Sequence, residues 1–229
     1  MEEGLEENRN IDENEASEDL FVHIKKKCKS YFVIKRLMDI IGSIFGLLLL
    51  SPIFIVTAFL MKIEEPKGPI FFSQTRVGKN EKPFKMYKIR SMCIDAEEKL
   101  AELLKHNEIE GAMFKMKDDP RVTKIGKIIR KTSIDELPQL WNVLKGDMSL
   151  VGPRPPLLRE VVNYTTYDKQ RLLIKPGCTG LWQISGRNEV GFDEMVELDL
   201  KYIKNISTKK DIEIIIKTIR VMVKPNGAY

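Results

Sequence analysis

Two adjacent carboxylates, Asp135 and Glu136, are the residues of this 229-residue chain whose type and setting best suit catalysis. They lie within 132–156, a segment that follows Arg130 and ends near Arg154, an arginine between two prolines. A carboxylate that faces a phosphate group needs its repulsion cancelled by cations or by a divalent metal ion. Two acids in this basic, proline-punctuated segment therefore predict a site for phosphate chemistry.

Four cations are candidates for binding substrate phosphates: Lys88, Arg90, Arg130 and Arg154. Magnesium suits such a site because it binds through one or two carboxylates together with substrate phosphates. Arg154 lies on the stiff backbone of Pro153 and Pro155, so its guanidinium loses little entropy when it binds a phosphate or a carboxylate. A structural salt bridge in a rigid loop explains Arg154 equally well.

The two acids also fit a purely structural explanation. Ser133 and Glu136 have the spacing of a capping box, in which Glu136 only satisfies a backbone donor. That helix would hold Pro138 in its interior, whereas a helix with Asp135 as its N-cap places Pro138 harmlessly in the first turn. The later start is favoured, because at a helix end both acids can reach one ligand and free backbone donors attract an anion.

Other common catalytic or metal-binding patterns are missing from the sequence. Cys28, Cys93 and Cys178 are odd in number and widely spaced, which argues against a disulfide framework or a thiolate metal site and fits a reducing compartment. His23 and His106 are far apart and have no ligand pattern around them. Histidine-based metal binding and a Ser-His triad are therefore not expected.

The charge is unevenly spread along the chain. Residues 1–19 hold nine acids and one arginine, a net charge of −8, so with +5 for the whole chain the remainder carries +13. The segment 1–19 is also poor in aromatic residues, and we expect a disordered acidic tail. A basic body indicates contact with phosphate in nucleic acid, anionic lipid or a nucleotide substrate, or simply a solvated basic surface, and the sign of the charge does not choose among these.

Residues 40–61 carry no charge and are long enough to form a membrane helix. As a helix they would extend roughly 33 Å, enough to cross a hydrocarbon core of about 30 Å. Ser51 and Pro52 lie in the middle, where the proline removes the hydrogen bond to the Leu48 carbonyl and leaves two arms of about 15 Å each. Ser51 could satisfy the freed carbonyl.

Lysines and arginines are abundant both in the basic juxtamembrane segment 20–39 and after residue 61. The positive-inside bias therefore draws both ends of the helix to the cytoplasm, which favours a re-entrant helix broken at Ser51-Pro52 over a kinked span. The rest of the chain, 62–229, is expected to form a compact catalytic domain on the cytoplasmic face.

Within this domain the pattern predicts an α+β fold that is mainly helical. Two aromatic-containing runs in 69–92 flank a turn at 77–82, a pattern typical of a small β-hairpin. Residues 95–108 have the spacing of an amphipathic surface helix. Residues 123–130 and 211–223 are apolar on one face, so each could lie on an anionic membrane surface, and the second could instead belong to the core.

Residues 31–229 resemble the monotopic phosphoglycosyl transferases, a family of small bacterial sugar transferases that act on polyprenyl phosphate. The matching motifs occur in the family's order: Lys35-Arg36 with Asp39, Ser51-Pro52, 84–88, 135–155, 175–180, 183–187 and 227–229. The acidic segment 1–19 departs from the family pattern. The resemblance implies a re-entrant helix in one leaflet that turns at Ser51-Pro52, with an active site at the cytoplasmic face.

The resemblance also implies roles for the site residues. Asp135 would be the nucleophile that attacks the β-phosphate of a UDP-sugar and releases UMP, after which a lipid phosphate takes the phosphosugar from the carboxylate. Glu136 would prepare the lipid phosphate or orient the metal ion. Lys88, Arg130 and Arg154 match the family's phosphate-handling cations, and Mg²⁺ would bridge Asp135 and the pyrophosphate.

The expected function is therefore the first step of capsular or exopolysaccharide synthesis at the bacterial cytoplasmic membrane. The expected partners are undecaprenyl phosphate, a UDP-sugar with UDP-glucose or UDP-galactose favoured, and membrane lipids; no nucleic acid is expected, and a homodimer stays open. Two other functions fit the residues alone: a glycosyltransferase that moves sugar only and releases UDP, and a non-catalytic module that binds anionic lipid or nucleic acid.

Overall fold

The structure is a computed structural model, and it describes residues 20, 22, 24, 29–103, 116, 119–185 and 191–223. Several of the sequence features lie wholly or partly outside the described residues: the acidic segment 1–19, part of the juxtamembrane segment 20–39, the end of the expected helix 95–108, the last two residues of the 183–187 motif and the terminal 227–229.

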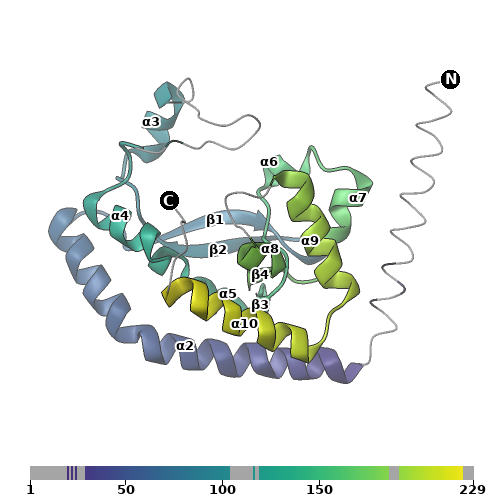
Figure 1. Ribbon diagram of the computed structural model, residues 1–229. Coiled ribbons are helices and arrows are strands. Elements are labelled where there is room, and N and C mark those ends of the chain that lie inside the picture. The colour runs from purple at the N-terminus through teal and green to yellow at the C-terminus, as the bar shows by residue number, and fades with distance from the viewer. Residues whose placement is uncertain are drawn as a thin grey trace, which may run out of the picture.

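Helix α2 (Lys29–Glu64) is the longest element, with 36 residues. The uncharged stretch 40–61 is its middle, and the helix continues through Pro52. Ser51 Oγ donates a hydrogen bond of 2.8 Å to the Leu48 carbonyl, the group that Pro52 leaves without its helical partner. Figure 1 shows α2 along one edge of the molecule, bending before it ends near α4. The expected compensation by Ser51 is confirmed.

The surface of α2 is apolar and largely uncovered. The helix is long and apolar enough to cross a membrane by length and composition, and 11% of its most apolar 18-residue window is buried. Phe45, Leu48 and Ile55 are each at least 65% exposed. A helix in the core of a soluble protein would bury such side chains, because their exposure to water is unfavourable. The exposure of α2 therefore indicates membrane association.

The other elements form two small sheets surrounded by short helices, so the mainly helical α+β prediction is confirmed. In chain order they are β1 (Phe71–Val77), η1 (Lys79–Glu81), β2 (Pro83–Ile89), α3 (Ala96–Leu103), α4 (Lys124–Lys131), η3 (Ile134–Glu136), α5 (Gln139–Lys145), β3 (Ser149–Val151), α6 (Leu158–Val161), α7 (Thr166–Lys169), η4 (Gln170–Leu173), β4 (Gly177–Thr179), α8 (Leu181–Ser185), α9 (Phe192–Lys204) and α10 (Thr208–Val223).

Strands β1 and β2 form the predicted antiparallel hairpin, in a register that pairs Phe71 with Ile89 and Val77 with Pro83. Strands β3 and β4 form a short parallel pair that the sequence patterns did not predict. Helix α3 confirms the first part of the expected helix 95–108, whose remainder lies outside the described residues.

Two side chains of α2 attach its N-terminal half to the rest of the fold. Arg36 donates to the carbonyls of Val143 and Leu144 in the last turn of α5, at 2.7 and 2.8 Å. Asp39 accepts from Ser149 Oγ at 2.9 Å and from the backbone N–H of the following residue at 2.8 Å. The Lys-Arg-x-x-Asp motif thus has a structural role here, which is to join the apolar helix to α5 and β3.

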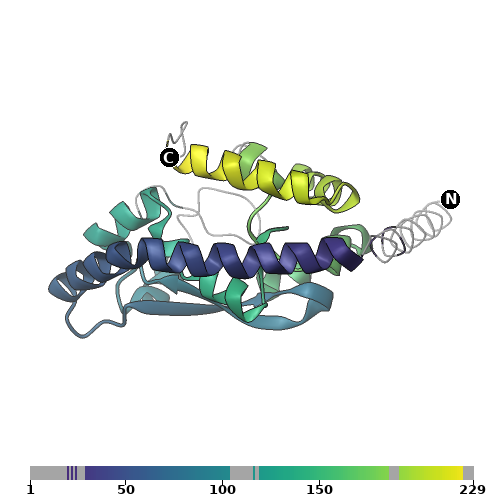
Figure 2. The same ribbon diagram turned by 90° about the horizontal axis from the view of Figure 1, so that it is seen from below.

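The largest hydrophobic cluster joins α9 and α10 to β3 and the start of α2, and Figure 2 shows α10 and the β1–β2 hairpin on opposite sides of α2. The two helices expected to lie at an interface each have one face in the core. Ile129 of α4 and Ile214 of α10 are buried, whereas Ile128, Ile212 and Ile216 are exposed. Each helix thus retains an exposed apolar face beside its buried one.

Candidate active site

Asp135 and Glu136 belong to the 3₁₀ turn η3, and neither proposed helix start is correct. Ser133 has φ 56° and makes no side-chain cap hydrogen bond, so the capping box does not form. Asp135 is not a helix N-cap either, because α5 begins at Gln139 with Pro138 as its N-cap. Pro138 lies between η3 and α5 and has no backbone N–H to donate. The hydrogen bonds of η3 therefore do not continue into α5 through Pro138.

Lys88 of β2 brings a cation to both acids. Its Nζ lies 2.9 Å from Glu136 Oε1 and 3.9 Å from Asp135 Oδ2. The side chain of Asp135 is 12% exposed, whereas that of Glu136 is 48% exposed. One acid is therefore held in a protected position and the other faces solvent, with the same ammonium group between them.

Hydrophobic packing places this dyad beside the C-terminal end of α2. Ile134, the residue before Asp135, packs with Met61 of α2, Ile89 of β2 and Ile129 of α4. Side chains from four elements thus meet directly behind the nucleophilic candidate. The dyad therefore lies at the C-terminal end of the exposed apolar helix.

The carboxylate of Glu64 strengthens the contact between the end of α2 and the start of α4. Glu64, the last residue of α2, accepts hydrogen bonds from the backbone N–H groups of Lys124 and Ile125 at 2.8 and 3.1 Å. These are first-turn donors of α4 that have no partner within their own helix, and a negative charge there also complements the helix dipole. The end of α2 and the start of α4 are thereby held together.

Asn142 of α5 fixes the strand that carries Lys88. It is fully buried, its Oδ1 accepts from the Tyr87 N–H at 3.0 Å and its Nδ2 donates to the Lys85 carbonyl at 2.7 Å. The amide imitates a neighbouring strand and satisfies buried backbone groups of β2. The position of Lys88 relative to η3 follows from this bond pair.

The electrostatic setting of Asp135 suits a nucleophile. Burial raises the pKa of Asp135 to about 6; the charges of Lys88 and Arg130 oppose this rise and that of Glu136 adds to it. At neutral pH the carboxylate is therefore mostly ionised but poorly solvated. A poorly solvated anion with cations beside it is primed to react, and such perturbed acids are typical of functional sites.

Arg90 was expected to bind phosphate, but the structure does not bring it to the dyad. Its guanidinium pairs with Glu65 and donates to the carbonyl of Met92 at 2.7 Å, while its Nε donates to that of Pro69 at 2.7 Å. These contacts close the loop between α2 and β1. Arg90 follows directly after β2, and its sequence position did not indicate that Glu65 and the carbonyl groups of Pro69 and Met92 would bind its guanidinium.

Arg154 has the salt bridge that its alternative explanation required. Its Nη1 lies 3.3 Å from Glu160 Oε2, and the same oxygen accepts from the Leu157 N–H at 2.9 Å. Arg154 nevertheless remains partly exposed, and its charge acts on Arg76. The ion pair with Glu160 therefore fixes Arg154 in the loop, where its charge acts on Arg76.

Arg76, near the end of β1, is the site residue that the sequence patterns missed. It is buried, its Nη1 donates to the Pro155 carbonyl at 3.1 Å and its Nη2 to Gln74 Oε1 at 2.8 Å. Its Nε has no hydrogen-bond partner among the described residues. Burial, and next the charge of Arg154, lower the pKa of Arg76 to about 10, while Glu136 opposes the change. A charged residue in a strand rich in aromatics was the available signal.

Comparison with known proteins decides the family. Residues 30–225 match the family described as bacterial sugar transferase. The chain belongs to this family. It is 55% identical over 201 residues to the galactosyl transferase CpsE of Streptococcus agalactiae and 47% identical over 200 residues to the undecaprenyl-phosphate galactose phosphotransferase of Salmonella typhimurium.

These two alignments cover 87% and 86% of this chain but 44% and 42% of the relatives, so the chain spans less than half the length of either. A third relative, the exopolysaccharide production protein ExoY of Sinorhizobium fredii, is 41% identical over 199 residues, which are 85% of this chain and 88% of that protein. The family match, residues 30–225, contains the dyad, its cations and all of helix α2 except its first residue.

The donor chemistry of the dyad in this bacterial sugar transferase can be compared with what a magnesium ion needs. Among the described residues no group of three or more His, Cys, Asp and Glu side chains forms a protein-only metal site. Asp135 and Glu136 are adjacent carboxylates, and Mg²⁺ commonly takes one or two carboxylates together with substrate phosphates. The donor set therefore fits magnesium bound jointly by the protein and a diphosphate.

Proposed function

We propose that this bacterial sugar transferase moves a sugar 1-phosphate from a UDP-sugar to undecaprenyl phosphate and releases UMP. The observation that carries the proposal is a protected carboxylate, Asp135, held by Lys88 at the end of an exposed apolar helix. The names of two relatives support it, an undecaprenyl-phosphate galactose phosphotransferase and a UDP-N-acetylgalactosamine-undecaprenyl-phosphate N-acetylgalactosaminephosphotransferase.

In the first step a carboxylate oxygen of Asp135 attacks the β-phosphorus of the UDP-sugar. A bond forms between that oxygen and the phosphorus, and the bond from the phosphorus to the bridging oxygen breaks, so UMP leaves with the electron pair. Lys88 and Arg130, whose charges act on Asp135, reduce the repulsion between the carboxylate and the diphosphate. The sugar phosphate is left on Asp135.

In the second step an oxygen of undecaprenyl phosphate attacks the same phosphorus. The bond to Asp135 breaks, the carboxylate is restored and the product is a polyprenyl diphosphate sugar. Glu136 is the more exposed acid and is placed to orient the lipid phosphate as it approaches. The charges of Arg154 and Glu136 both act on Arg76, and we propose that Arg76 and Arg154 help to hold a phosphate of either substrate.

Magnesium is the cofactor we propose, held by Asp135 and Glu136 with the substrate phosphates. When bound, it would neutralise charge on the diphosphate. Because the carboxylate forms a covalent intermediate, one difficult transfer is divided into two easier displacements.

We further propose that α2 is re-entrant and places the catalytic residues at the cytoplasmic face of the bacterial inner membrane. The Ser51–Leu48 hydrogen bond offsets the loss that Pro52 causes, and lysines and arginines flank the uncharged stretch on both sides. UDP-galactose is the first sugar donor to test, because two relatives are named for galactose transfer. The names CpsE and ExoY support a role in capsule or exopolysaccharide synthesis.

The identity of the released nucleotide tests this proposal. Membranes containing the protein and undecaprenyl phosphate are given UDP-galactose labelled in the β-phosphate, and UMP and UDP are measured separately. We expect UMP together with label in the lipid, and neither from the Asp135→Asn variant. Release of UDP with unlabelled lipid would establish a glycosyltransferase that moves sugar alone, and turnover by Asp135→Asn would remove Asp135 from the chemistry.

A further inference from the structure

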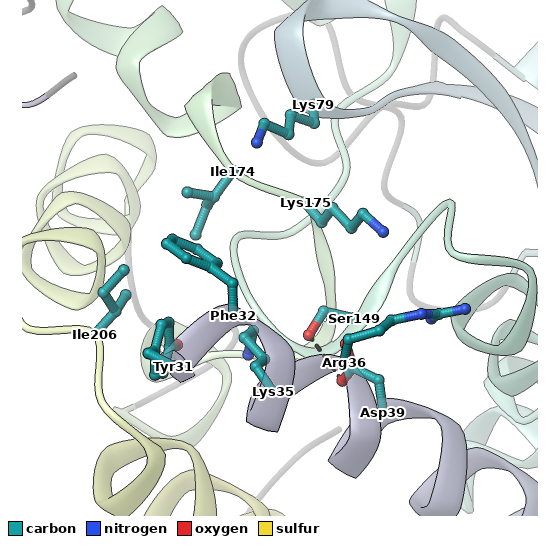
Figure 3. Close-up of a pocket in the computed structure, with 10 residues that line it drawn as sticks. All are labelled: Tyr31, Phe32, Lys35, Arg36, Asp39, Lys79, Ser149, Ile174, Lys175 and Ile206. Atoms are coloured by element: carbon teal, nitrogen blue, oxygen red, sulfur yellow. Dashed lines mark hydrogen bonds between the residues drawn. The ribbon is translucent and has the colours of Figure 1, made fainter. Parts of the chain in front are cut away.

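A cavity lies beside the N-terminal half of α2, and neither acid of the dyad belongs to its lining. It has a volume of about 190 Å³ and is open on one side. Figure 3 shows its lining residues, which come from α2, from η1, from β3 and the segment before β4, and from the segment after α9: Tyr31, Phe32, Lys35, Arg36, Asp39, Lys79, Ser149, Ile174, Lys175 and Ile206.

Two of its charged side chains are already satisfied by the fold. Lys35 forms an ion pair of 3.0 Å with Asp211, and Asp39 accepts the hydrogen bonds that attach α2 to β3. Arg36 is also hydrogen-bonded, but to neutral carbonyl groups, so these bonds do not cancel its positive charge. The negative charge of Asp39, which is also hydrogen-bonded only to neutral groups, opposes that of Arg36, so any excess positive charge of the cavity comes from outside α2.

Lys79 and Lys175 supply that positive charge. Both lysines line the cavity, and among the described residues neither ammonium group lies within ion-pair distance of a carboxylate. In Figure 3 the Lys79 side chain points toward Ile174 and that of Lys175 points toward the side of Arg36. A Cβ placed on Gly146 would lie 3.3 Å from Lys175 Nζ and 3.4 Å from Arg36 Nη2, so these two cations lie close together beside the end of α5. Burial and next the charge of Arg36 lower the pKa of Lys175, the effect expected for a cation crowded by cations.

The remaining wall of the cavity is apolar. Phe32 is partly exposed, and Tyr31, Ile174 and Ile206 complete this side. The apolar side is continuous with α2, whose exposed surface indicates membrane association. The volume is below the roughly 300 to 1,000 Å³ typical of sites for whole small molecules, so a small anionic group with an apolar continuation fits better than a nucleotide.

We propose that this cavity binds the phosphodiester headgroup of an anionic membrane phospholipid. Lys79 and Lys175 contact the headgroup, while the start of the acyl chains lies along Phe32 and follows α2 into the membrane. The bound lipid holds the N-terminal half of α2 at the membrane surface. This lipid is separate from the undecaprenyl phosphate acceptor, and the site stands independently of the proposed reaction at Asp135.

Native mass spectrometry of the full chain in detergent tests the site, with short-chain phosphatidylglycerol as the probe. We expect the Lys79→Ala/Lys175→Ala variant to bind it at least tenfold more weakly than the native chain. Lys82→Ala removes an exposed cation of the same hairpin turn outside the cavity, and it should change binding less than twofold. The Lys79→Arg/Lys175→Arg variant keeps both charges and should bind within a few-fold of the native chain, which separates loss of charge from loss of folding.

Two further probes separate a lipid site from a general anion site. Phosphatidylcholine, whose headgroup has no net charge, should bind more weakly than phosphatidylglycerol, and Phe32→Ala should weaken phosphatidylglycerol binding without changing that of inorganic phosphate. Equal binding of phosphatidylglycerol by the native and Lys79→Ala/Lys175→Ala chains would overturn the site. If inorganic phosphate bound with the same affinity as phosphatidylglycerol, the proposal that the ligand is a lipid would be overturned. Asp135→Asn should still bind phosphatidylglycerol, so failure of the reaction and failure of the lipid site are distinguishable.

Discussion

Replacing Lys88 by methionine should move the acid limb of the pH–rate profile to higher pH. Asp135 must be ionised to attack phosphorus, and its pKa of about 6 places the midpoint of the native limb near that value. Lys88 Nζ lies 3.9 Å from Asp135 Oδ2 and favours the ionised form. Removing this cation raises the pKa of Asp135, so the rate falls at pH values where the native chain is still active.

The distance sets the size of the effect. Two unit charges about 4 Å apart interact by about 1 kcal/mol in water and about 4 kcal/mol at an effective dielectric constant of about 20. Lys88 is partly exposed and lies closer to Glu136, so the lower part of this range applies, a rise of about 1 to 1.5 pKa units at about 1.4 kcal/mol per unit. At about pH 6.5 the variant should then be about three- to eightfold slower through lost ionisation alone.

The measurement is kcat/KM for UMP release between pH 5 and 9, which reports ionisations of the free enzyme. Lys85→Met is the matched control, because Lys85 is an exposed lysine of the same strand whose side chain alternates to the other face. We expect its limb to stay at the native position. An unchanged limb in Lys88→Met, or a native limb below pH 5, would refute the assignment of Asp135 as the titrating nucleophile.

Further predictions concern stability, phosphate binding, the membrane helix and the metal ion. Asp135→Asn should stabilise the protein at pH 7 by up to about 3 kcal/mol, because a folded-state pKa raised from 3.8 to about 6 penalises the ionised form; the gain should appear as pH rises from about 4 to about 6 in thermal unfolding, and a gain that is the same at both pH values would contradict the cause. Arg76→Gln should lower kcat/KM at least tenfold without moving the acid limb, as expected if it binds phosphate, and an unchanged kcat/KM would remove it from the site. Ser51→Ala should destabilise the detergent-solubilised protein by about 0.5–1.5 kcal/mol, because the Leu48 carbonyl loses its donor; an unchanged unfolding midpoint would show that this bond contributes nothing. EDTA should abolish UMP release and added Mg²⁺ restore it, whereas full activity in EDTA would exclude a required metal ion.

Features that depend on nearby residues were predictable from the sequence. The hairpin follows from two aromatic-containing runs around a turn, and the compensation of Pro52 by Ser51 follows from their adjacency. The meeting of Lys88 with Asp135 and Glu136 was anticipated from chemistry. The first two features depend on local contacts, and the third depends on the attraction between opposite charges.

Features that depend on which residues, distant in sequence, bind a given side chain in the folded protein were not predictable. Arg90 lies two residues after Lys88, yet its guanidinium is bound by Glu65 and two loop carbonyls and not by the dyad. Arg76 gained its place from the proline loop, whose Pro155 carbonyl accepts from it across 79 positions of sequence. The start of α5 depended on how Pro138 interrupts the preceding turn. Both helix starts considered from the sequence, including the favoured one at Asp135, lie before the observed start at Gln139.

Intact-mass spectrometry after mixing the protein with UDP-galactose, with no lipid acceptor present, tests the covalent step most directly. We expect the mass of the chain to increase by one sugar phosphate, peptide mapping to place it on Asp135, and undecaprenyl phosphate to remove it at a rate no slower than turnover. A chain that releases UMP only when the lipid is present, with no adduct at any time, would contradict a covalent intermediate, and an adduct on another residue would contradict the role of Asp135.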